Sequence, residues 1–165
     1  MNKEEERATS QVTGTLLLVV ITVIIAIILL QSISIPDFNG KYSEPPAIFK
    51  ITSIRSSPPT YESQVFLRNV AQEDYHNQEL SAKIYRDDKL LPCTIETLNT
   101  HDFIATAHYG VKNFKGTGGC DETWNYNQML RIDLSDGFIH PGDTIRVDII
   151  KTATGTVISR DSMEA

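Results

Sequence analysis

A continuous apolar segment lies near the start of the sequence, after a short charged stretch. Of the fifteen positions in residues 16–30, thirteen are leucine, isoleucine or valine, and the other two are Thr22 and Ala26. A helix over this segment would be apolar on all sides, so it would lack the wet face that a helix lying on a soluble domain keeps. Residues 12–30 would rise about 28 Å, which is close to the hydrocarbon thickness of a bilayer. The pattern predicts a long apolar α-helix over residues 9–35.

A second pattern, the alternation of apolar and polar side chains that is typical of strands, begins near residue 48. Glycine, proline and aspartate interrupt it about every ten positions, as turn residues do. Seven or eight short strands with such turns indicate an antiparallel, immunoglobulin-like β-sandwich over residues 48–165. The segments predicted as strands are 48–54, 64–70, 80–86, 89–95, 102–109, 129–134, 144–150 and 156–159.

Residues 36–47 connect the two patterns. Pro36 predicts the end of the helix, because its ring cannot continue the hydrogen-bond ladder. Gly40, Pro45 and Pro46 punctuate the remainder of this stretch. The chain is therefore expected to consist of a helix, a connector and one head domain.

The residues immediately before the apolar segment form a motif. Arg7 and Ala8 precede a short, uncharged polar stretch that begins with Thr9 and leads to Gly14. This motif resembles the leader of archaeal type IV pilins, in which a membrane peptidase cuts ahead of the apolar helix and leaves the helix on the mature protein. The resemblance continues for about twenty positions, through Val12, Gly14, Leu18, Val20, residues 21–24 and Ala26. It implies a leader over residues 1–8 and a cut between Ala8 and Thr9.

The resemblance implies a structural subunit of a surface filament that polymerises through its helix and serves adhesion. The expected partners are copies of the chain itself, a prepilin peptidase, an assembly ATPase and a membrane platform. The precursor would reside in the membrane, and the filament would be extracellular. The expected assembly positions are Val12, Gly14, Leu16, Leu18, Val20, Ile21, Ile24, Ala26, Ile28 and Leu30.

The physical chemistry of the helix supports self-association independently of the resemblance. Removing residues 1–8 deletes every charged side chain that precedes the apolar segment. The remaining stem can be sheltered by lipid or by identical helices, and a head-to-tail array of identical contacts can extend without closing. Gly14 and Ala26 are small enough to allow close approach between helices, although both residue types are also ordinary within a membrane span.

Two other interpretations of the apolar segment remain open. A secretory signal peptide would need a positive leader, whereas this leader has two basic and three acidic side chains. A permanent single-span anchor would instead present the β-domain as a cell-surface binding module. The first of these would remove the helix from the mature protein, and the second would keep it in lipid.

Composition excludes several functions. The chain has 15 basic and 21 acidic residues, a formal net charge of −6, which argues against nucleic-acid binding. No serine, histidine or carboxylate pattern forms a recognisable catalytic set, so we expect no enzyme, no cofactor and no metal. The four histidines are scattered without the spacing of metal ligands.

Two features of the head allow alternatives. Cys93 and Cys120 are the only cysteines, and on an exported domain such a pair predicts one disulfide, with two buried thiols as the alternative. Four aromatic residues lie near one another in the sequence, and they either cap the core or offer contacts to another surface. They are Tyr109, Phe114, Trp124 and Tyr126.

Overall fold

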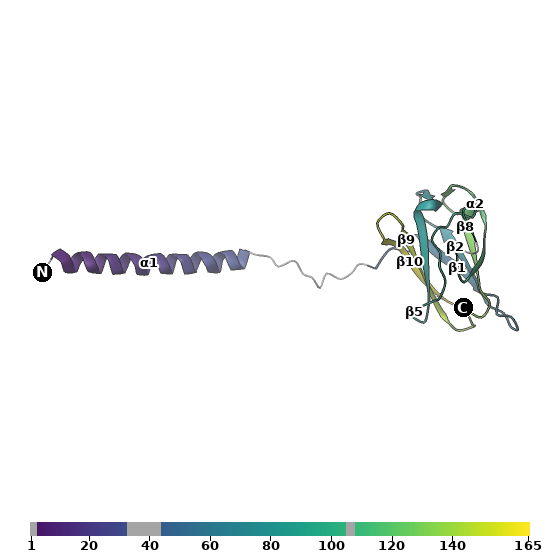
Figure 1. Ribbon diagram of the computed structural model, residues 1–165, viewed down its shortest axis with the longest axis horizontal. Helices are drawn as coiled ribbons and strands as arrows, with labels where there is room; N and C mark the ends of the chain where they lie inside the picture. Colours follow the sequence, from purple (N-terminus) through teal and green to yellow (C-terminus); the bar gives the residue numbers. More distant parts are fainter. Residues whose placement is uncertain (1–2, 33–43, 105–107) are drawn as a thin grey trace. The chain divides into compact units, whose positions relative to one another are not determined.

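A computed structural model of the chain describes residues 3–32, 44–104 and 108–165, and within the first of these ranges it describes the side chains of residues 12–28. The chain divides into two compact units, Met1–Tyr42 and Ser43–Ala165. Figure 1 shows a helix in the first unit and β-strands in the second.

The first unit contains one helix of 30 residues, α1 (Lys3–Ser32). It begins six residues before the predicted start at residue 9, so residues 3–8 of the expected leader are helical as well. The predicted end of the helix, residues 33–35, and residues 36–43 of the connector lie outside the described residues. An α-helix satisfies its own backbone hydrogen bonds, which suits a segment with no polar face.

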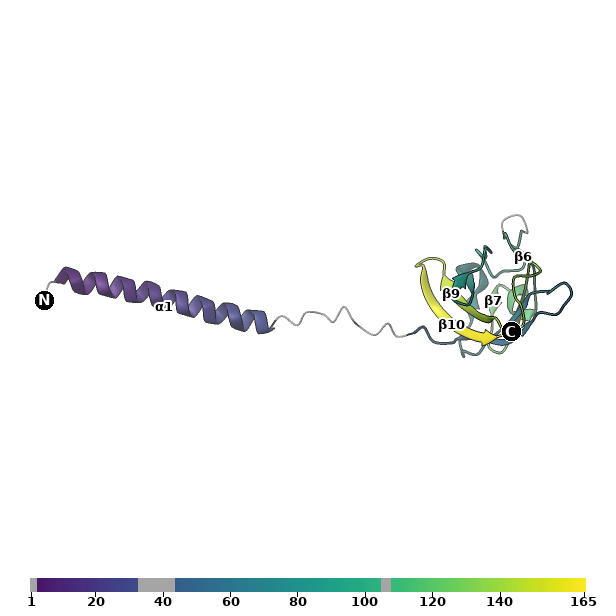
Figure 2. The ribbon, with the colours of Figure 1, turned by 90° about the horizontal axis from the view of Figure 1, so that it is seen from below.

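The second unit is a sandwich of two antiparallel four-stranded sheets (Figures 1 and 2). Sheet 1 has the spatial order β1 (Phe49–Arg55), β2 (Gln64–Asn69), β8 (Met129–Leu134) and β6 (Val111–Lys115). Sheet 2 has the order β10 (Thr156–Glu164), β9 (Thr144–Lys151), β4 (Leu80–Arg86) and β5 (Lys89–Leu90). With β3 and β7 set aside, which pair in a ribbon of their own, this is the strand order of an immunoglobulin sandwich with one added edge strand, β5.

A short ribbon and two short helices cover one end of the sandwich. The ribbon pairs β3 (Tyr75–His76) with β7 (Thr123–Trp124), and the helices are η1 (Asn77–Glu79) and α2 (Thr117–Cys120). The side-chain amide of Asn77, which is fully buried, donates to the carbonyls of Gly118 and Asp121, both at 2.8 Å. A buried amide with these partners ties η1 to α2, and we call this part of the head the capped end.

The alternating residues of the strands form the core between the sheets. Val65 and Leu67 of β2 and Leu130 and Ile132 of β8 are fully buried, and Ile145 of β9 faces them from sheet 2. At the capped end, the core is completed by the indole of Trp124, which is fully buried and lies 4.4 Å from the ring of Phe49. These contacts hold the two sheets in fixed register.

Side chains close the edge where β1 meets β10. The backbone N–H of Phe49 donates to the hydroxyl of Ser159 at 2.9 Å, and that of Ile51 donates to the carboxylate of Asp161 at 2.8 Å. Each bond satisfies an edge amide of β1 that no neighbouring strand reaches. The seam therefore protects this edge against pairing with another chain.

Most of the strand predictions are confirmed. The segments 48–54, 64–70, 80–86, 129–134 and 144–150 coincide with β1, β2, β4, β8 and β9 to within one residue at each end. The strand predicted over 156–159 extends to residue 164, and only residues 89–90 of the segment 89–95 form a strand. The strand predicted over 102–109 is wrong for its described residues, where the N–H of His108 donates to the carbonyl of Ile104 in a turn. The sequence did not reveal β3, β6 or β7.

Candidate assembly interface

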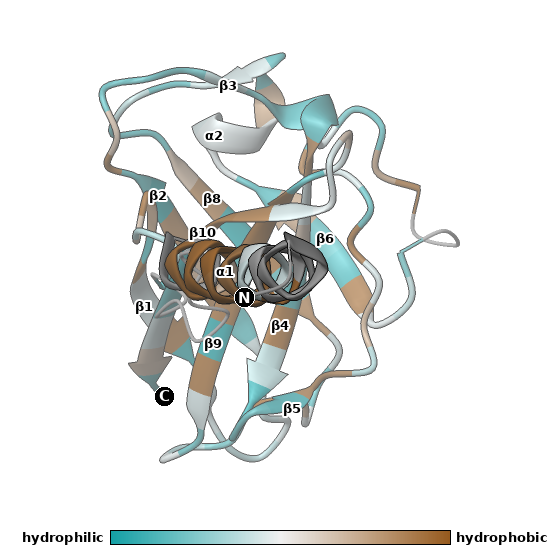
Figure 3. Cartoon of the chain, turned by 90° about the vertical axis from the view of Figure 1, so that its left-hand side faces the viewer, coloured by the Kyte–Doolittle hydropathy of each residue, from teal (hydrophilic) through white to brown (hydrophobic). Residues whose placement is uncertain are grey.

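The side chains of α1 are exposed on every side over residues 12–28. Figure 3 shows α1 with a long brown, hydrophobic stretch beside paler turns. Twelve large apolar residues of this range are between 48% and 65% exposed, and they include Val12, Leu16, Leu18 and Ile24. A helix that is hydrophobic all round is stable only when other apolar groups surround it. This surface is the largest candidate contact area in the described part of the chain.

Small and hydroxyl-bearing residues do not give the helix a polar face. The hydroxyls of Thr15 and Thr22 donate to the carbonyls of Val12 and Val19, at 2.9 and 2.8 Å, one turn back along the helix. The hydroxyl of Thr22 is therefore satisfied within the helix. A side chain built at Gly14 would meet nothing within 4 Å, so the space beside this glycine is open to a second helix.

The roles of the leader-processing residues and of Leu30 remain predictions. Arg7, Ala8 and Thr9 have helical backbone within α1, while their side chains and that of Leu30 lie outside the described residues. Processing between Ala8 and Thr9 therefore stays an expectation from the resemblance.

No helix in the described residues combines the length and the hydropathy that a membrane crossing needs.

The predicted disulfide is not formed in the structure. Cys93 and Cys120 are both free thiols, the first half-buried and the second exposed. Cys93 follows β5 and lies beside Gly110, whereas Cys120 ends α2, where its carbonyl contacts the ring of His101 at 2.7 Å. The two thiols therefore have different neighbours in the structure, and the disulfide between Cys93 and Cys120 stays a prediction from their number.

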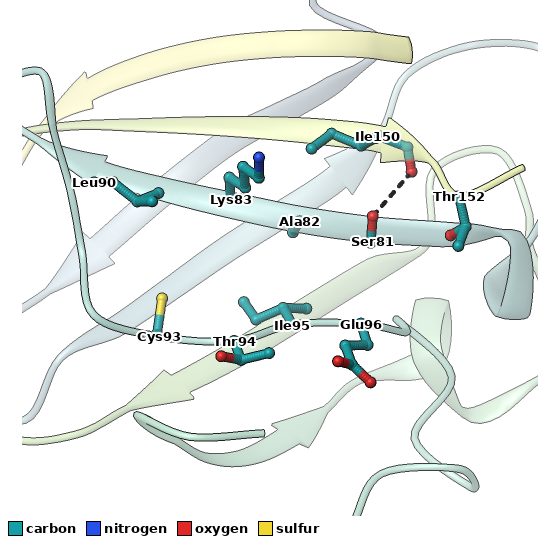
Figure 4. A pocket seen from close by; sticks show the side chains of 10 residues that line it. All are labelled: Ser81, Ala82, Lys83, Leu90, Cys93, Thr94, Ile95, Glu96, Ile150 and Thr152. Carbon is teal, nitrogen blue, oxygen red and sulfur yellow. Dashed lines mark hydrogen bonds between the residues drawn. The ribbon is translucent and has the colours of Figure 1, made fainter. Parts of the chain in front are cut away.

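Cys93 lines a groove of about 610 Å³ between β4 and the segment that follows β5. Figure 4 shows the side chains of Cys93 and Ile95 pointing from this segment towards β4, while Glu96 points away. Burial raises the pKa of the Cys93 thiol to about 11, against a smaller opposing effect of a hydrogen bond from the backbone of Ile84. Lys83 also lines the groove, but the effect of burial dominates and keeps the thiol protonated near neutral pH, so we expect Cys93 to be a weak nucleophile.

The two thiols should therefore differ in reactivity. With iodoacetamide at pH 8, we expect Cys120 to be alkylated first and Cys93 to react at least tenfold more slowly, because a pKa near 11 leaves about one thiol in a thousand ionised. Raising the pH towards 11 should accelerate Cys93. Peptide mass spectrometry of the folded protein measures both rates, and a Cys120→Ser variant isolates the slower one. Equal rates at pH 8 would contradict this assignment.

The histidines and the aromatic residues are separated by the fold. Among the described residues, no group of three or more potential metal ligands converges.

The four aromatic residues have divided roles: Trp124 and Phe114 are buried in the core, whereas Tyr109 and Tyr126 are 70% and 58% exposed. Trp124 and Phe114 are therefore core residues, whereas contacts of Tyr109 and Tyr126 with another surface stay a prediction.

The outward-facing side of sheet 1 is a second surface, which the sequence pattern did not reveal. Each of its strands carries one or two basic residues, and this clustering is hidden in a chain whose net charge is negative. The signal was present in the polar positions of segments already predicted as strands. It required the strand order to show that these positions lie side by side.

Comparisons with known proteins give few matches. No protein-family model and no curated protein matches the chain. The archaellum periplasmic stator protein FlaG from Sulfolobus acidocaldarius is similar in structure, with a TM-score of 0.41 and 10% sequence identity over 71% of this chain and 97% of that one. A solved archaellum periplasmic stator complex of FlaF and FlaG from the same organism gives a TM-score of 0.43 and 10% identity, over 76% of this chain and 94% of that one. Similarity at this level carries no conclusion about function.

Proposed function

We propose that the chain is a structural subunit of a type IV pilus-like surface filament of the archaeal kind, in which α1 packs among copies of itself. The observation that carries the proposal is the exposed apolar surface over residues 12–28 of α1. A β-sandwich that functioned as an isolated soluble protein would have no use for such a segment. The proposal assigns the chain a role in assembly and no catalytic activity.

The energetics favour burial of the helix. Complete burial of an aliphatic side chain is worth about 1.5–3 kcal/mol, and these twelve side chains are already about half covered by the helix itself. The remaining gain is on the order of 10–20 kcal/mol per helix, which is an upper bound. That is comparable to the whole folding free energy of an ordinary domain, so the helix cannot persist uncovered in water.

The steps of assembly follow from the resemblance to archaeal type IV pilins. A prepilin peptidase removes residues 1–8 from a membrane-inserted precursor, and an assembly ATPase with a membrane platform moves the subunit into the filament. The heads then lie on the extracellular surface, where adhesion is the usual role. No cofactor, metal or nucleic acid takes part. The second candidate, a single-span anchor that carries a binding module, would keep residues 1–8 on the protein.

Mass spectrometry of the native protein from cells separates these two candidates. The filament subunit should begin at Thr9, and the anchored module should retain the residues before it. Replacing Arg7 and Ala8 together, by Arg7→Gln and Ala8→Leu, should leave the leader uncut and abolish surface filaments. The matched control, Lys3→Gln, also removes one positive charge from the leader and should be processed normally. Unchanged processing and unchanged filaments in the double variant would overturn the proposal.

A further inference from the structure

The outward-facing side of sheet 1 is a basic surface on an acidic protein. Six basic side chains and one carboxylate lie on its four strands, whereas the whole chain has a formal net charge of −6. The cross-strand register places them in rows, because Lys50 pairs with Arg68, and Arg131 lies opposite both Phe66 and Lys115. We call this surface the basic face, and its charged residues are Lys50, Arg55, Arg68, Lys112, Lys115, Arg131 and Asp133.

Most of the positive charge on this face is uncompensated. Lys112 pairs with Asp136 at 2.6 Å and Arg131 pairs with Asp133 at 2.8 Å. Within the described residues, the other four cations form no ion pair. Arg55 lies over the ring of Phe66, 5.1 Å from its guanidinium carbon, and the guanidinium of Arg68 donates to the side-chain oxygen of Asn127 at 3.0 Å, a neutral partner that leaves its charge in place. The cations without an ion pair are Lys50, Arg55, Arg68 and Lys115. A face with four such cations attracts a negatively charged surface.

The capped end of the same head carries the opposite charge. Six exposed carboxylates gather there on segments that hydrogen bonds hold together, including those from Asn77 to α2 and from Asn69 to the carbonyl of Glu73. One of the six, Glu79, has a cation nearby, the ammonium group of Lys151 at 3.8 Å. Figure 3 shows β3 and α2 together at this end, with β5 at the other. The six are Glu73, Asp74, Glu79, Asp102, Asp121 and Glu122.

An exposed aromatic residue accompanies these carboxylates. Tyr126 follows β7 and is 58% exposed, and the next residue, Asn127, donates its N–H to the carbonyl of Asn69 beside the acidic segment. On the basic face, the half-buried ring of Phe66 lies in the middle row between its cations. Each surface therefore has an aromatic group among its charges, and aromatic residues and arginine are enriched in protein–protein contacts.

We propose that the basic face of one head binds the capped end of a second copy of this chain. The argument is charge complementarity within one sequence: four cations meet five carboxylates, and none of these nine groups forms an ion pair within residues 44–104 and 108–165. The two surfaces are different, so the contact is heterologous: a pair leaves the capped end free on one copy and the basic face free on the other. Repetition of such a contact extends a row of heads without closing it.

This contact adds binding between neighbouring head domains to the proposed filament, but it does not depend on α1. Electrostatic complementarity mainly sets the orientation and the rate of association, whereas hydrophobic burial supplies most of the affinity. In a filament, the pairing would fix the register of neighbouring heads while the helices hold the subunits together. Failure of the head contact would leave assembly through α1 intact, so the two proposals can fail separately.

The test uses charge reversal and rescue in the full-length chain, purified in a zwitterionic detergent. Variant 1, Lys50→Glu with Lys115→Glu, reverses charges on the basic face. Variant 2, Asp74→Lys with Glu122→Lys, reverses the capped end, and variant 3 combines all four changes. The control, Lys83→Glu with Lys89→Glu, makes the same charge change as variant 1 on exposed residues of sheet 2.

A carbodiimide that joins a lysine to a carboxylate at zero length provides the readout. Mixing ¹⁴N- and ¹⁵N-labelled chains distinguishes links between copies from links within one copy. We expect inter-copy links between the two surfaces at 50 mM salt, and their loss at 1 M salt, where the screening length falls to about 3 Å. Variants 1 and 2 should each lose these links by about tenfold, variant 3 should restore them, and the control should match the native chain.

Three results would overturn the proposal. It fails if variants 1 and 2 retain the inter-copy links, or if variant 3 does not restore them while circular dichroism shows all variants folded. Retention on immobilised heparin at 50 mM salt is measured in parallel. If variant 1 loses this retention while inter-copy links remain unchanged, the basic face binds an anionic polysaccharide and the proposal is wrong.

Discussion

Replacing Ile24 with aspartate should abolish filaments on the cell surface. Ile24 lies in the middle of the exposed apolar surface of α1 and is 50% exposed. A carboxylate at this position would be buried without a partner when neighbouring helices cover it. Even at the centre of a membrane-spanning helix, a charge costs about 2.5–3.5 kcal/mol, and a repeating array imposes the cost once per subunit. Electron microscopy of cells that carry the variant as their only copy measures the effect.

Two observations make the Ile24 result specific. Ile24→Leu keeps volume and hydropathy, so its filaments should match those of the native chain. Fractionation of the cells shows whether the aspartate variant accumulates in the membrane or is lost. Normal filaments built from the aspartate variant would show that this part of α1 is not covered by its neighbours.

Replacing Trp124 with alanine should cost the head about 3–5 kcal/mol of its free energy of unfolding. The indole is fully buried, contacts the ring of Phe49, and donates its N–H to the carbonyl of Gln128 at 2.9 Å. A side chain added at Gly118 would collide with it, so the surrounding chain is closely packed and cannot easily fill the cavity. Because Trp124 is the only tryptophan, far-UV circular dichroism during urea unfolding is the suitable measurement.

The neighbouring exposed aromatic residue provides the matched control. Tyr126→Ala removes a ring that is 58% exposed and should change the free energy of unfolding by less than about 1 kcal/mol. If the Trp124 variant lost no more stability than this control, the capped end would contribute little to the core.

The strands that could be predicted are those whose two faces differ in polarity. In β8, Leu130, Ile132 and Leu134 face the core while Met129, Arg131 and Asp133 face outward, so the sequence alternates without interruption. The same holds for β2 and for most of β4 and β9. Alternation fixes both the strand and its register, because a shift by one residue would exchange its two faces.

The missed strands fail this condition for identifiable reasons. A bulge between Val111 and Asn113 breaks the alternation of β6, and β3 and β7 contain only two residues each. The end of β10 carries Ser159 and Asp161, which point towards β1 and accept its amide hydrogens, so polar residues stand where a core pattern would need apolar ones. Pro92 lacks an N–H, and β5 ends at Leu90, before it.

The candidate site was predictable only where it depends on a continuous segment. The apolar positions of α1 are adjacent in sequence, so their exposure follows from composition alone. The basic face combines Lys50 and Arg68 with Arg131 and Lys115, whose proximity depends on the order of four strands. The state of Cys93 and Cys120 likewise depends on the path of the loops between strands, which the number of cysteines does not determine.

Electron microscopy of material sheared from the cell surface, with peptide identification, tests the central claim most directly. The account predicts filaments that contain this chain, with Thr9 as the first residue and residues 12–28 protected from proteases inside the fibre. A dispersed, lipid-free monomer that still carries residues 12–28 would contradict it, because nothing would then shelter the apolar surface of α1.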